Sequence, residues 1–129
     1  MSAPLTAMTV AGIMSGTSAD GIDVAITRIT PHSDDPEAPN LKLLGHAGFP
    51  FPPALRRAVL AAMNADAIAT AELARLNWRL GQAYSEALEA ALERHPCRLD
   101  LVGCHGQTIY HQATAARYLG RDVACTWQI

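Results

Sequence analysis

The sequence contains no apolar run that approaches the roughly 18 residues needed to cross a bilayer as a helix. It also has little net charge, −2, which favours neither a nucleic acid nor an acidic membrane surface as a partner. The first residues lack the basic segment and long apolar core of a secretory signal. The three cysteines form no Cys-x-x-Cys pair, so buried or free thiols in a reducing cytoplasm are expected.

The chain is nevertheless rich in the residues that build a core. Half of its 129 residues are hydrophobic and 17% are charged, which is typical of a soluble globular domain and not of a disordered segment. This length is sufficient for one domain with a sizeable core.

The most informative stretch is a polar loop between two apolar runs. Residues 8–14 and 22–29 predict two strands, and the first strand is expected to be covered on both faces. The connecting stretch, residues 15–23, is rich in glycine, hydroxyl and acidic side chains. Gly16 and Gly21 permit positive φ and close backbone approach. Successive backbone N–H groups in such a turn form an anion site, so the loop predicts a phosphate-holding hairpin. The alternative is that residues 20–21, Asp-Gly, are simply a hairpin turn.

The rest of the chain predicts a third strand, two helices and further strands. A third strand over 41–49 completes an antiparallel meander, and a solvated loop is expected over 31–40. Helices are predicted over 54–64 and 71–95.

Several details of the longer helix and the next strand are also predicted. Thr70 is expected to be the N-cap, and Gly81 to mark close packing or a break. Trp78 and Tyr84 are expected to be packing groups. Residues 99–104 predict a buried strand that pairs in parallel with an earlier one. A hairpin arm is expected from Thr108, and a last strand over 122–129.

A second polar cluster follows the strand that ends at Cys104. His105, Gln107 and Thr108 lie at the carboxyl end of a sheet strand, where ligands bind in open α/β sheets. One interpretation is that they contact a substrate or orient a water. The other is that His105 is a hydrogen-bonded interior histidine and Gln107 bonds nearby backbone.

Two segments resemble motifs of a known enzyme family. Gly12-Ile-Met-Ser-Gly-Thr-Ser-Ala-Asp-Gly-Ile-Asp23 and Gly103-Cys-His-Gly-Gln-Thr-Ile-Tyr-His111 resemble motifs of the anhydro-N-acetylmuramic acid kinases, in the same order and at fitting spacing. The resemblance implies an α/β fold of the actin-like ATPase (ribonuclease H-like) type. Residues 1–129 would form a partial N-terminal nucleotide-binding lobe of a larger two-lobe kinase.

The resemblance also implies a reaction and a set of site residues. Family members use ATP to open 1,6-anhydro-N-acetylmuramic acid and to phosphorylate its 6-oxygen, which yields N-acetylmuramic acid 6-phosphate in cell-wall (murein) recycling. The implied cofactors are ATP and Mg²⁺. The implied nucleotide-binding residues are Gly16, Thr17, Ser18, Ala19, Asp20, Gly21, Ile22 and Asp23. The implied substrate-binding residues are His105, Gln107 and Thr108.

The catalytic base is not expected within this chain. The family's catalytic aspartate belongs to a later motif, beyond Ile129, so Asp20, Asp23 and Asp100 are not assigned that role, and these 129 residues alone are expected to be inactive. Asp100 is expected to face solvent. Asp20 or Asp23 is the candidate magnesium ligand, and the sequence does not decide between them.

Two alternatives and several further expectations remain open. The chain is alternatively a non-catalytic phosphate- or nucleotide-binding fragment, or part of a related kinase that acts on a different sugar. The expected partner is a small anhydro amino sugar, with no nucleic acid and no membrane, and the full-length protein is a possible homodimer. A cytoplasmic location is expected.

Overall fold

Three consecutive strands form the antiparallel meander that the sequence predicts. The computed structural model describes residues 6–32 and 38–129, and in it β1 (Met8–Met14) pairs with β2 (Gly21–Thr30), which pairs with β3 (Asn40–Pro50). On its other side, β1 pairs in parallel with β4 (Leu101–Cys104), as predicted, and the strand order is β3-β2-β1-β4. The loop expected over 31–40 lies partly outside the described residues.

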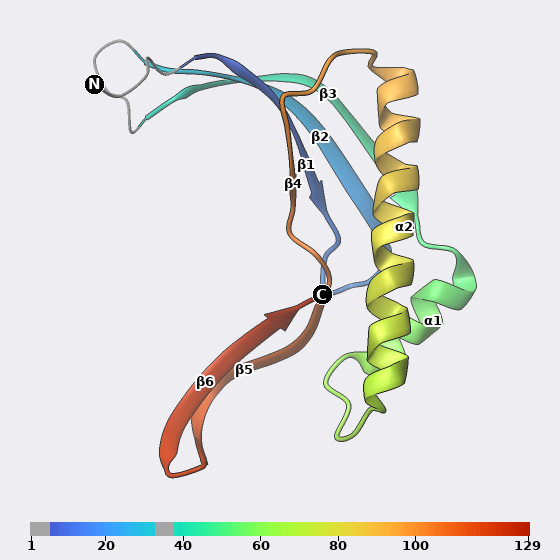
Figure 1. Ribbon diagram of the computed structural model, residues 1–129, viewed down its shortest axis with the longest axis vertical. Coiled ribbons are helices and arrows are strands. Elements are labelled where there is room, and N and C mark those ends of the chain that lie inside the picture. Colours follow the sequence, from blue (N-terminus) through green and yellow to red (C-terminus); the bar gives the residue numbers. More distant parts are fainter. Residues whose placement is uncertain (1–5, 33–37) are drawn as a thin grey trace.

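Two helices follow β3, and the second lies along one face of the sheet (Figure 1). Helix α1 (Pro53–Ala62) begins at the second residue of a proline pair, since a proline is tolerated in the first helical turn. Helix α2 (Thr70–Arg94) is rich in alanine and leucine, and it buries a stripe that recurs every three or four residues. The buried positions are Leu76, Leu80, Ala83, Tyr84, Ala87 and Ala91.

Two predictions about α2 are wrong. The N-cap is Ala69, without a side-chain hydrogen bond, and Thr70 is already the first helical residue. Helix α2 runs without interruption through Gly81, and a Cβ placed there would meet no atom of the described residues within 4 Å, so this glycine marks neither a break nor close packing within the described structure.

The core lies between α2, α1 and one face of the sheet. Ala11 and Ile13 of β1, with Ile22 and Val24 of β2, are buried there. The alternate residues of β1 point to the opposite face, because successive side chains of a strand alternate between faces; Gly12 and Met14 are exposed there, and Met8 and Val10 are half-buried. The expectation that β1 is covered on both faces is therefore wrong for the part of the chain that the structure describes.

Strand β4 also differs from its prediction. All four of its residues are exposed, including Leu101 and Val102, although they are apolar. The strand lies at the edge of the sheet, with β1 as its only pairing partner among the described strands. Its apolar composition indicated burial, but no described element packs on it.

The last two strands form a separate hairpin that projects away from the sheet (Figure 1). Strand β5 (Thr108–Tyr118) pairs with β6 (Arg121–Gln128), so the predicted arm and last strand are confirmed as one two-stranded unit. Gln107 and Ile129 close its base through two backbone hydrogen bonds of 2.8 and 3.0 Å. None of the helices in the described residues has the length and apolar content required to span a membrane.

Candidate functional site

The loop between β1 and β2 is a tight turn whose position differs from the Asp-Gly alternative. The backbone N–H of Ala19 donates to the carbonyl of Gly16 at 3.0 Å, so the turn lies over 16–19, and Gly21 already belongs to β2. Neither Gly16 nor Gly21 has positive φ. Ala19 does, with φ of 51°, and its side chain is fully buried. The left-handed position that the sequence suggested for a glycine is thus occupied by an alanine.

The second prediction for Gly21, that another backbone segment approaches it closely, is confirmed. A Cβ at this position would lie 2.3 Å from the carbonyl oxygen of Phe49 and 3.2 Å from the Cα of Pro50. Only a residue without a side chain allows β2 and β3 to pair at this point. The glycine therefore fixes where the loop leaves the sheet.

The loop presents a group of hydrogen-bond donors to solvent. Gly16, Thr17 and Ser18 are exposed, and within residues 6–32 and 38–129 their backbone N–H groups have no acceptor. The hydroxyls of Thr17 and Ser18 add two more donors. Consecutive free N–H groups in a turn are suited to binding an anion, so the geometry fits the predicted phosphate site.

The second predicted cluster lies against this loop. The backbone N–H of His105 donates to Ile13 at the end of β1 (2.9 Å). The side-chain Nε2 of Gln107 donates to the carbonyl of Gly16 (3.1 Å) and to that of Thr108 (3.3 Å). Gln107 is fully buried, and it joins two segments that are 91 positions apart in the sequence.

The three residues of this cluster have different surroundings. Gln107 bonds backbone, yet its Oε1 is buried and has no hydrogen-bond donor among the described residues. His105 is exposed, with Nδ1 3.2 Å from the carbonyl of Gly106, so it is not the interior histidine of the alternative interpretation. The hydroxyl of Thr108 accepts from the side chain of Gln128 at 3.3 Å.

Hydrogen bonds of Ser15 connect the β1–β2 loop to α2 and to the segment that follows β4. Ser15 Oγ and Tyr84 Oη lie 2.8 Å apart, and Ser15 also donates to the carbonyl of Gly106 at 3.4 Å. Both side chains are buried, so the expectation that Tyr84 packs in the interior is confirmed. Burial raises the pKa of Tyr84, the hydrogen bond with Ser15 lowers it by less, and charge on Cys104 raises it slightly.

Replacing Tyr84 with phenylalanine is expected to lower the free energy of unfolding by about 1 kcal/mol at neutral pH, because one buried hydrogen bond is lost. The raised pKa adds a pH dependence. Above the unfolded value of 10.0, the unfolded chain releases the phenolic proton more readily than the folded one. Stability from this group is complete below pH 10 and is lost as pH rises through the folded pKa.

Urea unfolding of both proteins between pH 8 and pH 11 measures this effect. The stability difference between wild type and Tyr84→Phe should shrink above pH 10. A difference that stays constant across the range would show that burial does not perturb this phenol.

The acidic residues in and near the β1–β2 loop have different partners. Asp20 is paired with Arg56, and Asp23 Oδ1 lies 3.1 Å from His46 Nε2; both carboxylates are largely exposed. The described residues contain no cluster of three or more His, Cys, Asp or Glu side chains placed to hold a metal ion. Asp100 is exposed as expected, and its carboxylate also accepts from the backbone N–H of Thr9 at 2.8 Å, a structural role.

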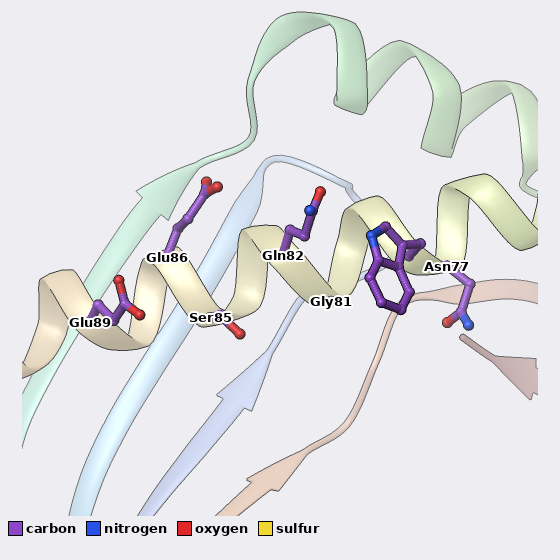
Figure 2. A pocket seen from close by; sticks show the side chains of 7 residues that line it. Asn77, Gly81, Gln82, Ser85, Glu86 and Glu89 are labelled. Atoms are coloured by element: carbon purple, nitrogen blue, oxygen red, sulfur yellow. The ribbon is translucent and has the colours of Figure 1, made fainter.

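Two surface hollows differ in their relation to these segments. One, of about 780 Å³, lies on the sheet face opposite α2, and Asp23, His46 and His105 are among its lining residues. The other, of about 560 Å³, follows the outer surface of α2 around Trp78, and its lining includes no residue of either motif (Figure 2). Trp78 is 73% exposed, so the expectation that it is a packing group is wrong for the described part of the chain.

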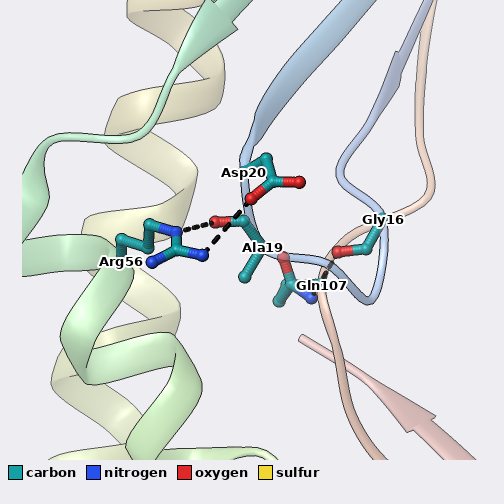
Figure 3. A network of polar contacts seen from close by, with 5 residues as sticks. All are labelled: Gly16, Ala19, Asp20, Arg56 and Gln107. Atoms are coloured by element: carbon teal, nitrogen blue, oxygen red, sulfur yellow. Dashed lines mark hydrogen bonds and ion pairs between the residues drawn. The ribbon is translucent and has the colours of Figure 1, made fainter.

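Sequence reasoning missed one residue that contacts the loop. Arg56 of α1 donates from Nε to the carbonyl of Ala19 (3.0 Å), and its Nη2 lies 3.3 Å from Asp20 Oδ1 (Figure 3). The only sequence signal was that Arg56 lies off the apolar face of its helix. Nothing in the spacing of 36 residues connects it to Asp20.

Comparison with known proteins agrees with these motifs. The sequence model of the family described as anhydro-N-acetylmuramic acid kinase matches residues 8–124. Proteins named anhydro-N-acetylmuramic acid kinase include one from Synechococcus elongatus, 38% identical over 93% of this chain and 31% of the relative. Another, from Vibrio cholerae, is 34% identical over 82% of this chain and 28% of the relative.

The chain thus spans about 30% of the length of the curated relatives that it matches. The family match covers nearly all of the described residues, including β1, the loop and the cluster after β4. The chain belongs to the anhydro-N-acetylmuramic acid kinase family.

Proposed function

We propose that this chain supplies the phosphate-binding loop and part of the sugar site of an ATP-dependent kinase. The kinase would open 1,6-anhydro-N-acetylmuramic acid and phosphorylate its 6-oxygen, within cell-wall recycling in the cytoplasm. The observation that carries the proposal is the hydrogen bond from Gln107 to Gly16, because it unites the two family motifs. An actin-like ATPase lobe is the proposed fold, supported by the order β3-β2-β1-β4 with a helix before the parallel strand.

The loop residues fit the triphosphate of ATP. Phosphoryl transfer depends mainly on positioning and on charge neutralisation. The free N–H groups at 16–18 and the hydroxyls of Thr17 and Ser18 would hold phosphate oxygens. Ala19, Gly21 and Ile22 would shape the loop, since Ala19 and Ile22 are buried and Gly21 abuts β3.

The acidic residues fit a magnesium ion held through few protein ligands. Magnesium keeps several waters and is bound by one or two carboxylates together with phosphate oxygens. Asp20 or Asp23 would supply that carboxylate, and both are exposed at the edges of the loop. A magnesium ion bound together with ATP would neutralise part of the negative charge of the phosphates.

The cluster at 105–108 would form one wall of the sugar site. The buried Oε1 of Gln107 requires a donor, and an O–H or N–H from a ligand or a water would satisfy it. Exposed His105 would face the sugar across the hollow that it shares with Asp23. Thr108, bonded to Gln128, would orient the segment. The catalytic base is proposed to lie outside these 129 residues.

The test is an activity assay of the longest protein that the gene encodes. The assay mixture contains ATP, Mg²⁺ and 1,6-anhydro-N-acetylmuramic acid. The expected product is N-acetylmuramic acid 6-phosphate, identified by mass spectrometry. Absence of product, with ATP still bound, would overturn the substrate assignment and favour a different sugar, which a panel of anhydro and ordinary sugars would reveal. The 129 residues alone are expected to bind phosphate without turnover, and turnover by them would show that the base lies within this chain.

A further inference from the structure

The β1–β2 loop contains a backbone conformation that must be held in place. Ala19 has φ of 51°, in the left-handed region that L-residues with a side chain rarely adopt. Such a conformation persists only where its surroundings fix it. Two features do so here. The alanine side chain is completely buried in the core, and its carbonyl oxygen accepts a hydrogen bond from Arg56.

Arg56 binds the loop through two different groups (Figure 3). Its Nε–H donates to the Ala19 carbonyl at 3.0 Å, and its Nη2 lies 3.3 Å from the Asp20 carboxylate. The planar guanidinium can make both contacts together because its donors have a fixed geometry. Arg56 thereby fixes the Ala19–Asp20 peptide from a helix that belongs to neither motif.

The charge of Arg56 has a second consequence for an anion in the loop. Asp20 lies two positions after the free N–H groups of residues 16–18, where its carboxylate would repel a phosphate. Pairing with a guanidinium offsets that negative charge. The ion pair is solvent-exposed, with side chains 45% and 74% accessible, so it contributes little to global stability.

We propose that Arg56 is a positioning residue for phosphate binding, which holds the Ala19–Asp20 peptide and offsets the charge of Asp20. This inference rests on the proposed function, because it concerns the same loop. It predicts a local effect on the loop and on anion affinity, with little effect on unfolding. A purely structural arginine would show the opposite.

The experiment compares Arg56→Gln, Arg56→Lys and the control Arg57→Gln in the 129-residue chain. Arg57 is the neighbouring exposed arginine on α1, with no hydrogen bond or ion pair to any residue that the structure describes. Amide hydrogen exchange of Ala19, whose N–H donates to Gly16, is measured without ligand. Magnesium tripolyphosphate is then titrated into ¹⁵N-labelled protein, because this probe needs no adenosine site.

Arg56→Gln is expected to speed exchange in the loop and to weaken tripolyphosphate binding roughly tenfold, with an unchanged unfolding midpoint. Arg56→Lys should restore part of the affinity through its charge but not the slow exchange, since lysine is a point charge that cannot reproduce both contacts. Arg57→Gln should behave as wild type.

Four outcomes would overturn the inference. Unchanged exchange in Arg56→Gln would show that the arginine does not hold the loop. An equal loss of affinity in Arg57→Gln would show that the effect comes only from the overall positive charge of the helix. If wild type shows no response to tripolyphosphate, phosphate binding by the loop itself is refuted, whereas wild-type binding with unchanged affinity in Arg56→Gln refutes the role of Arg56 alone.

Discussion

Leu80→Ala is expected to lower the free energy of unfolding by about 3 to 5 kcal/mol. Leu80 lies at the middle of α2, is completely buried, and belongs to the cluster that joins α2 to the sheet. Truncation removes buried methyl groups and leaves a cavity that the surrounding helix and sheet fill only partly. Since a domain of this size has about 5 to 15 kcal/mol of total stability, the loss is a large share of it.

Urea unfolding followed by circular dichroism measures the effect, with Leu60→Ala as the matched control. Leu60 is on α1 and is 42% exposed, so its truncation should cost below about 1 kcal/mol. Equal losses for the two variants would contradict the assignment of the core to the inner surface of α2.

Gly21→Ala is expected to lower the free energy of unfolding by about 3 kcal/mol. The new Cβ would meet the carbonyl oxygen of Phe49 at 2.3 Å and its carbonyl carbon at 3.1 Å. Both are backbone atoms, so no side-chain rotation relieves the overlap, and β2 and β3 must separate at the Gly21–Pro50 pair. Because the β1–β2 loop ends at this pair, affinity for tripolyphosphate should fall as well.

Gly103→Ala is the control for this substitution. Gly103 is also a strand glycine of the same sheet, but a Cβ there would meet nothing within 4 Å. Its unfolding free energy should stay within about 0.5 kcal/mol of wild type. If Gly21→Ala were as stable as Gly103→Ala, the close approach of β2 to β3 would not exist in solution.

The sequence predicts the elements of this fold better than their burial. Alternating and continuous apolar runs locate the strands, and a three-to-four-residue stripe locates α2, because these patterns are local. Burial depends on what covers an element. The apolar residues of β4 and the indole of Trp78 are exposed, since no described element packs against them. Composition indicates whether a side chain prefers to be buried, but it does not show which residues surround that side chain.

The candidate site divides in the same way. The sequence predicts each motif and its place at the end of a strand. The contacts that unite the site are long-range: Gly16 with Gln107, Ser15 with Tyr84, and Arg56 with Asp20. They depend on how α1, α2 and β4 dock on the sheet, which spacing does not encode. The left-handed backbone at Ala19 was missed because propensity assigns that conformation to glycine.

The parallel pairing of β1 with β4 has a consequence for the order of folding. The meander joins strands that are neighbours in sequence, whereas the Thr9–Asp100 contact closes a loop of 91 positions. Closing so long a loop costs more chain entropy than forming a hairpin, so β4 should dock after the meander and α2 have formed. The segment that carries His105 and Gln107 arrives only with β4. The β1–β2 loop is therefore built early, the segment at 105–108 beside it is built last, and that segment should be the first part of the candidate site to open in the native state.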